Sequence, residues 1–120
     1  MSRILIVDDS AFARRRLESI FKGLGHEIVG LAENGSRALE LYQSLHPDLV
    51  TLDHLMAGKS GEQVLKEIIE FDPDARVVFI SGSGDHAIAE RVIEAGAKEF
   101  VAKFNTQQDF GKVLERVINA

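Results

Sequence analysis

Short runs of apolar residues recur five times along the chain, and each is followed by a segment whose apolar residues return every three or four positions. The runs occupy residues 3–7, 27–31, 49–53, 76–80 and 98–101. Continuous aliphatic runs are typical of strands buried on both faces, as in parallel sheets. The run at 27–31 is more polar than the others, so we expect it nearer an edge of the sheet.

The segments between the runs carry the start signals of helices. A residue whose side chain can accept a hydrogen bond from the first turn stands where each helix would begin. These expected N-caps are Ser10, Asn34, Ser60, Asp85 and Thr106. The expected buried stripes are Phe12, Leu17, Ile20, Phe21 and Leu24; Ala38, Leu41 and Leu45; Val64, Leu65, Ile68 and Ile69; Ile88, Val92 and Ile93; and Phe110, Val113, Leu114, Val117 and Ile118.

Strands and helices thus alternate without an internal repeat or a linker. Such alternation is typical of a parallel sheet with right-handed crossovers and helices on both faces. We therefore predict one α/β domain over residues 1–120, with five helices around a doubly wound five-stranded parallel sheet in the flavodoxin-like strand order 2-1-3-4-5. In that order the switch point lies between the first and third strands. Asp8 and Asp9 end the first strand and Asp53 ends the third, so the three carboxylates should share one crevice.

Composition narrows the class of protein. Apolar residues make up 45% of the chain, which is typical of a globular domain. A formal charge of −5 argues against a general nucleic-acid binder. The chain has no cysteine, which excludes disulfides and thiolate metal sites and is compatible with a reducing compartment. The first apolar run is too short for a signal peptide or a membrane span, so we expect a cytoplasmic protein without a membrane partner.

The expected crevice has the chemistry of phosphoryl transfer. Three carboxylates repel one another unless a cation lies among them, and a cluster of oxygen ligands suits Mg²⁺. Lys103 follows the fifth run and Ser81 ends the fourth, so both should lie at the same edge of the sheet. A metal ion and a lysine can neutralise phosphoryl oxygens while Asp53 attacks phosphorus in line.

These residues also occur in the order and spacing of a known family. The motifs are Ile4 to Ser10, Leu49 to Asp53 with Met56 and Gly61 after it, Ser81-Gly82, Glu94 to Ala97, Phe100 and Lys103. Together they resemble the receiver domain of response regulators in two-component signalling, and most of all the small stand-alone chemotaxis receivers. The resemblance spans the whole chain.

The resemblance implies a role for each carboxylate. Asp53 would accept a phosphoryl group from the phosphohistidine of a sensor histidine kinase or a phosphotransfer protein. Asp9 would bind Mg²⁺ directly, Asp8 would bind it mainly through water, and the backbone carbonyl of Leu55 would complete the protein ligands. Apart from this self-catalysed transfer and a slow self-dephosphorylation, the domain would not be an enzyme.

The resemblance also implies a switch. Lys103 would pair with the phosphoryl oxygens, Ser81 would turn toward them, and Phe100 would rotate inward. This would reshape the face made by the fourth helix, the fifth strand and the fifth helix, where such domains bind downstream proteins. We expect a monomer or weak dimer, and the Met at position 1 with an end just after the last helix favours a stand-alone protein.

Two positions depart from the family pattern. Ala57 and Phe104 stand where the family usually has proline. The family's bond after the lysine is normally cis, but a cis bond before a residue other than proline costs roughly 3–4 kcal/mol. We therefore predict a trans Lys103–Phe104 bond and a rearranged loop.

Other readings remain open from the residues alone. The two departures support a degenerate receiver that acts through protein contacts without phosphorylation. A Mg²⁺-dependent hydrolase would need a lid or second domain, and a flavin-binding protein would need hydroxyls where Asp8 and Asp9 stand. The run from Arg14 to Arg16 is interpreted as a solvated helix face, with kinase docking as the alternative. His54 is interpreted as a surface residue, since this chemistry needs no acid or base there.

Leu55 leads to a prediction about the lifetime of the phosphoryl group. In the family the side chain two positions after the phosphorylated Asp influences hydrolysis, and an apolar Leu55 cannot orient an attacking water. We predict slow self-dephosphorylation, which Leu55→Asn should accelerate. Loss of phosphoryl mass over time in both proteins measures this, and slower loss from Leu55→Asn would refute it.

Overall fold

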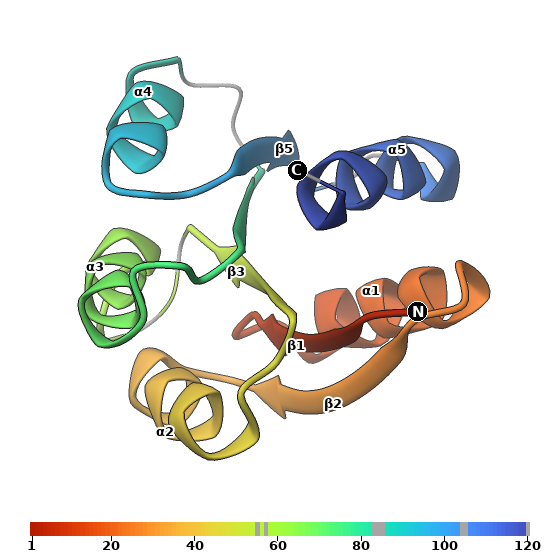
Figure 1. Ribbon diagram of the computed structural model, residues 1–120, viewed down its shortest axis with the longest axis horizontal. Coiled ribbons are helices and arrows are strands. Elements are labelled where there is room, and N and C mark those ends of the chain that lie inside the picture. The colour runs from red at the N-terminus through yellow and green to blue at the C-terminus, as the bar shows by residue number, and fades with distance from the viewer. Residues whose placement is uncertain (55, 57, 83–85, 104–105, 120) are drawn as a thin grey trace.

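The computed structural model describes residues 1–54, 56, 58–82, 86–103 and 106–119. Five strands and five helices alternate along the described chain (Figure 1). The strands are β1 (Arg3–Val7), β2 (Glu27–Ala32), β3 (Leu49–Asp53), β4 (Val77–Ser81) and β5 (Glu99–Ala102). The helices are α1 (Ala11–Gly23), α2 (Gly35–Leu45), α3 (Gly61–Phe71), α4 (His86–Glu94) and α5 (Gln107–Ile118). The predicted alternation is confirmed, with boundaries that differ by one or two residues.

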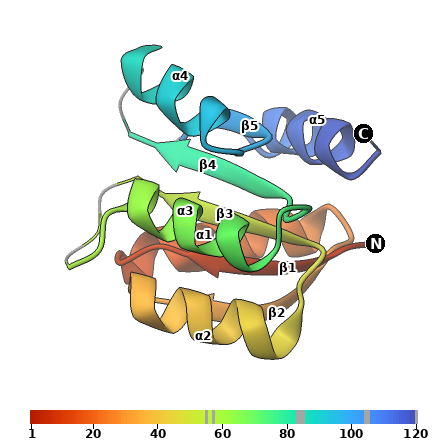
Figure 2. The same ribbon diagram turned by 60° about the vertical axis from the view of Figure 1, so that its left-hand side comes forward.

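The strands form one parallel sheet in the order β2-β1-β3-β4-β5, which confirms the predicted fold class. The more polar β2 lies at an edge, as expected. Helices α1 and α5 cover one face of the sheet and α2, α3 and α4 cover the other (Figure 1). All strands run in the same direction, so their carboxyl ends gather at one edge of the sheet (Figure 2).

Alternating residues of each strand supply two cores. On β1, Ile4 and Ile6 pack with α1 and α5, whereas Leu5 and Val7 pack with the helices of the opposite face. All five residues of β3 and of β4 are buried, which matches the continuous apolar runs in the sequence. The central strands are therefore covered on both faces, and polar groups reach solvent mainly at the strand ends.

Four of the expected helix caps are present. The side chains of Ser10, Asn34, Ser60 and Thr106 each accept a hydrogen bond from a backbone N–H in the first turn of their helix. Asp85, the fifth expected cap, lies outside the described residues. The capping residues identified from the sequence thus fix where four of the helices begin.

Two predicted core positions are wrong. Phe12 is 74% exposed and Ile93 is 46% exposed, because each lies beside rather than on the buried stripe of its helix. Conversely, Tyr42 of α2 is buried, although the sequence pattern did not predict it to be part of the core. Its hydroxyl lies 2.8 Å from a carboxylate oxygen of Asp72, and burial, this hydrogen bond and the nearby charge raise the pKa of Tyr42. Among the described helices, none has the length and hydropathy to cross a membrane.

The start of α3 packs unusually close to the end of β3. A Cβ atom built on Gly61 would lie 2.3 Å from the carbonyl oxygen of Asp53 and 3.0 Å from the Cα of His54. Backbone atoms cannot move aside as the end of a flexible side chain can. Glycine at position 61 therefore allows α3 to begin directly against the strand that carries Asp53.

We predict that Gly61→Ala lowers the free energy of unfolding by about 1–3 kcal/mol, because the added methyl group forces α3 away from β3. Chemical denaturation measures the change. Gly82→Ala is the control, since a Cβ there meets nothing within 4 Å and should leave stability nearly unchanged. Equal stability of the Gly61→Ala protein and the parent would contradict this account of the close approach.

Candidate functional site

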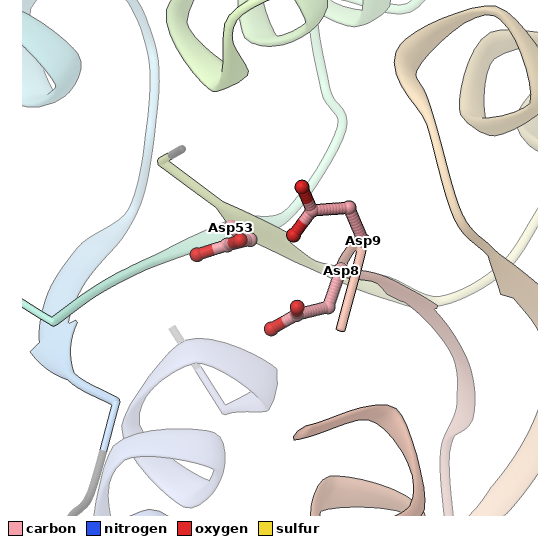
Figure 3. A group of neighbouring side chains, drawn as sticks. All are labelled: Asp8, Asp9 and Asp53. Carbon is pink, nitrogen blue, oxygen red and sulfur yellow. The ribbon is translucent and has the colours of Figure 1, made fainter. Parts of the chain in front are cut away.

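Three carboxylates meet where β1 and β3 end. Asp8 and Asp9 follow the last residue of β1, and Asp53 is the last residue of β3 (Figure 3). One carboxylate oxygen from each lies within 4.8 Å of the other two. Asp8 and Asp53 are only 1% and 4% exposed, whereas Asp9 is exposed to solvent. The structure thus brings together the three acids that the sequence placed at the switch point.

Lys103 reaches the same cluster from the end of β5. Its Nζ lies 3.1 Å from Asp8 Oδ2 and 3.5 Å from Asp53 Oδ1, so one ammonium group contacts two of the three carboxylates. The backbone N–H of Lys103 donates to the carbonyl of Ser81 at the end of β4, at 2.8 Å. Lys103 is therefore held both to the neighbouring strand and to the acids across the sheet.

The Asp53 carboxylate is electrostatically unfavourable in this position. Burial, followed by the negative charge of Asp8, raises its pKa from 3.8 to about 6, although Lys103 lowers it. Burial lowers the pKa of Lys103, but its hydrogen bonds and charge pairing with Asp8 and Asp53 outweigh burial and raise it. A pKa near 6 still leaves most of the Asp53 carboxylate ionised at pH 7, so it remains a usable nucleophile.

The donor set fits a hard divalent cation. Asp8 Oδ2 is buried and accepts no hydrogen bond from the described residues, although the Lys103 ammonium lies close enough for charge pairing. Asp9 faces solvent, which leaves room for the water ligands that Mg²⁺ keeps. Leu55, expected to add a backbone carbonyl, lies outside the described residues. Oxygen ligands with unsatisfied negative charge are what Mg²⁺ binding needs.

The two expected switch residues lie on neighbouring strands. Ser81 ends β4 and is 1% exposed. Phe100 lies on β5, half-buried, and its ring stacks on that of Phe79 with centroids 6.2 Å apart and an interplanar angle of 13°. Phe100 thus lies between the core and the surface, and β4 separates its strand from β3, which carries Asp53.

The interpretation of residues 14–16 as a solvated helix face is wrong for two of the three arginines. Arg14 Nη1 donates to the backbone carbonyl of Asp8 at 2.6 Å, and Arg16 Nη1 donates to the backbone carbonyl of Lys103 at 3.0 Å. Both are half-buried, whereas Arg15 is exposed. A signal was present in the sequence, because Arg14 and Arg16 flank the buried stripe of α1 at helical spacing while Arg15 lies opposite.

His54 is also more than a surface residue. Its ring is half-buried beside Phe79, with centroids 5.8 Å apart, and its Nε2 lies 3.9 Å from Glu62 Oε1. Glu62 accepts two hydrogen bonds from Arg91 of α4, and these bonds lower the pKa of Glu62 more than any other influence. Through Glu62 of α3 and Arg91 of α4, His54 is thus connected with both helices. Sequence reasoning missed them because no local pattern pairs Glu62 with Arg91.

Comparison with known proteins agrees with this geometry. The sequence profile of the response regulator receiver domain matches residues 4–115. The chain belongs to this family. The chemotaxis protein CheY of Thermotoga maritima is 44% identical over 101 residues, which cover 84% of the receiver and 84% of that protein. CheY of Bacillus subtilis is 45% identical over 101 residues, with the same coverage of both chains.

Solved structures place the receiver in the same family. A chain in the crystal structure of the CheX–CheY–BeF₃–Mg²⁺ complex from Borrelia burgdorferi is 37% identical, with a TM-score of 0.89 over 98% of the receiver and 87% of that chain. The receiver domain of the regulator NarL from Mycobacterium tuberculosis is 28% identical, with a TM-score of 0.93 over 99% of the receiver and 97% of that chain. The expected resemblance is thereby confirmed.

The expected peptide geometry between Lys103 and Phe104 stays a prediction, because Phe104 lies outside the described residues. The same holds for Ala57. The structure does describe Lys103 itself. Its ammonium lies among the carboxylates although residue 104 is phenylalanine and not proline.

We predict that Asp53→Asn raises the free energy of unfolding of the metal-free receiver by about 1–3 kcal/mol at pH 7, because it removes a buried charge that its neighbours disfavour. A raised pKa means that protonation favours the folded state, so the penalty is absent below about pH 4 and complete above about pH 6. The gap between the two proteins should therefore close as the pH falls from 7 to 4.

Added Mg²⁺ supplies the control. It should stabilise the parent receiver more than Asp53→Asn, since a ligand that binds only the folded state raises stability according to its affinity. Denaturation curves with and without Mg²⁺ measure both effects. If the Asp53→Asn protein has a lower free energy of unfolding than the parent in the absence of metal, the electrostatic account is contradicted.

Proposed function

We propose that this receiver is a phospho-acceptor whose Asp53 takes a phosphoryl group and whose surface changes as a result. The observation that carries the proposal is the contact of one Lys103 ammonium with both Asp8 and Asp53 at the centre of a three-carboxylate cluster. A buried nucleophilic carboxylate with a cation beside it is suited to an incoming group that carries several negative oxygens. We take residues 1–120 as one such domain; the family profile matches 4–115.

In the proposed transfer, an Asp53 oxygen attacks the phosphorus of a phosphohistidine in line with the bond that breaks. A phosphorus–oxygen bond forms, the phosphorus–nitrogen bond breaks, and its electron pair returns to the imidazole of the donor. When bound, Mg²⁺ supplies positive charge that offsets the carboxylates and the phosphoryl oxygens. Asp8 and Asp9 would hold it together with Asp53 and, as the family implies, the Leu55 carbonyl, and Lys103 would pair with a phosphoryl oxygen.

A second displacement, hydrolysis by water, restores the resting protein. Water attacks phosphorus, the bond to the Asp53 oxygen breaks, and inorganic phosphate leaves with the carboxylate regenerated. This step consumes one water molecule and needs no oxidant or reductant. We accordingly infer that the receiver turns over no separate substrate and acts as a signalling module.

The proposed switch runs through Ser81 and Phe100. Ser81 ends β4 beside the strand that carries Asp53, so a short rotation would bring its hydroxyl toward a phosphoryl oxygen. Phe100 is half-buried on the next strand, where an inward rotation would change the surface made by α4, β5 and α5. The phosphoryl group would favour this arrangement because it makes contacts only there.

The proposed partners are a sensor histidine kinase or phosphotransfer protein and a downstream protein that reads the switched face. Support comes from the CheY relatives, which are chemotaxis proteins, and from the Borrelia burgdorferi structure, in which CheX and CheY form a complex. We therefore favour chemotaxis as the pathway and the cytoplasm, where kinases have ATP, as the location.

A degenerate receiver that acts without phosphorylation is the second reading of the sequence. Its support was the residue types at positions 57 and 104. The assembled carboxylates and Lys103 speak against it, because a buried cluster of like charges is costly to keep without a ligand.

The deciding experiment is phosphorylation by a small donor. We expect incubation with acetyl phosphate and Mg²⁺ to add one phosphoryl mass to the intact receiver, because the site itself supplies the catalysis. Asp53→Asn should show no added mass, and Lys103→Met should be phosphorylated about a hundredfold more slowly, as expected when one group that stabilises developing charge is removed.

Chelation of Mg²⁺ with EDTA is the matched control and should stop the reaction. No added mass in the parent receiver, or added mass that persists in Asp53→Asn, would overturn the proposed function. A capture experiment with the same preparation would then test whether the receiver binds a protein partner without phosphorylation.

A further inference from the structure

Arg16 of α1 makes a contact with the site that belongs to none of the roles assigned above. Its Nη1 donates to the backbone carbonyl of Lys103 at 3.0 Å, across 87 positions of sequence. The arginine is half-buried, and its guanidinium reaches the residue just after the end of β5. A charged side chain held in this way orders the backbone that it contacts.

The backbone at Lys103 is thereby held from two sides. Its N–H donates to the Ser81 carbonyl on β4, and its carbonyl accepts from Arg16 on α1. With both polar groups of the residue bonded, the direction in which its side chain leaves the chain is set. That direction brings the ammonium to 3.1 Å from Asp8 and 3.5 Å from Asp53.

The residue after Lys103 makes this support important. A proline at position 104 would restrict the backbone of Lys103 to extended conformations and fix its own φ angle. This chain has Phe104, which imposes neither restriction. A hydrogen bond to the Lys103 carbonyl acts on the same peptide group that a proline ring would restrict.

We propose that Arg16 is a positioning residue that fixes the backbone of Lys103 and so places the Lys103 ammonium for the phosphoryl group. The proposal rests on the phospho-acceptor function for its role in the reaction, but the placement of Lys103 is a property of the unphosphorylated chain. Arg14 of the same helix donates to the backbone carbonyl of Asp8, the residue after β1.

The first test is chemical and needs no phosphorylation. Competitive acetylation of amines, followed by peptide mass spectrometry, measures how accessible Lys103 is relative to the exposed Lys66. Arg16→Met keeps most of the apolar stem and removes the donor, and it should raise the relative labelling of Lys103 several-fold. Arg15→Met removes the same charge from the exposed face of the same helix and should leave the labelling unchanged.

The second test is kinetic. With acetyl phosphate as donor, so that no protein docks on α1, Arg16→Met should slow phosphorylation about tenfold, as expected from a small misplacement of a catalytic group. In a Lys103→Met background the same change should alter the rate less than about twofold, because the two residues act through one group. Arg16→Lys keeps the charge and one donor, and it should fall between the parent and Arg16→Met.

The outcomes separate the two proposals. A parent receiver that is not phosphorylated overturns the proposed function, and the labelling alone then decides the role of Arg16. If Arg16→Met is phosphorylated and labelled to the same extent as Arg15→Met, the positioning role is overturned. The proposed phospho-acceptor function is unaffected by that result. An equal slowing by Arg16→Met with and without Lys103 also overturns it, since Arg16 would then act elsewhere. If Arg16→Met does not unfold cooperatively, the same two measurements are compared between Arg16→Lys and Arg15→Met instead.

Discussion

The repulsion between buried carboxylates at the end of β1 and β3 is the constraint on which the site depends. Asp8 and Asp53 are almost fully buried, and burial together with the charge of Asp8 raises the pKa of Asp53 to about 6. A domain of this size has a net stability of only about 5–15 kcal/mol, so an uncompensated cluster of this kind would be a serious cost. Lys103 offsets part of it, and the repulsion that remains favours the binding of a cation among the three carboxylates. Without a cation, the cluster therefore keeps a repulsion that a bound cation would relieve.

Much of this could be predicted from the sequence, because the decisive residues stand at strand ends. Asp8, Asp9 and Asp53 each follow or end a continuous apolar run, and a parallel sheet brings such ends to one edge whatever the details of the helices. Lys103 was predictable for the same reason. Periodicity also gave the number and order of the elements, since the central strands are buried on both faces.

What could not be predicted depends on contacts between side chains and distant backbone. The acceptors for Arg14 and Arg16 are carbonyl groups of Asp8 and Lys103, and a carbonyl has no signature in a sequence. The pairing of Glu62 with Arg91 depends on how α3 and α4 lie against the sheet. Phe12 was misplaced because one position along a helix turns a side chain by about 100°, enough to move it from the core to solvent.

The hydrogen bonds around the segment after Asp53 have a consequence for how such a domain can diversify. The His54 N–H donates to the Ile80 carbonyl at 2.9 Å, and the Gly61 N–H donates to the His54 carbonyl at 3.1 Å. Both ends of the segment 54–61 are therefore anchored close together, and closing a loop costs only about 0.6 kcal/mol more for each doubling of its length. The length of the chain between these two anchors can therefore change at little cost in loop closure, whereas Gly61 and the capping Ser60 are needed to start α3 against β3. The chain that follows Asp53 can thus vary in length independently of the packing that holds α3 against β3.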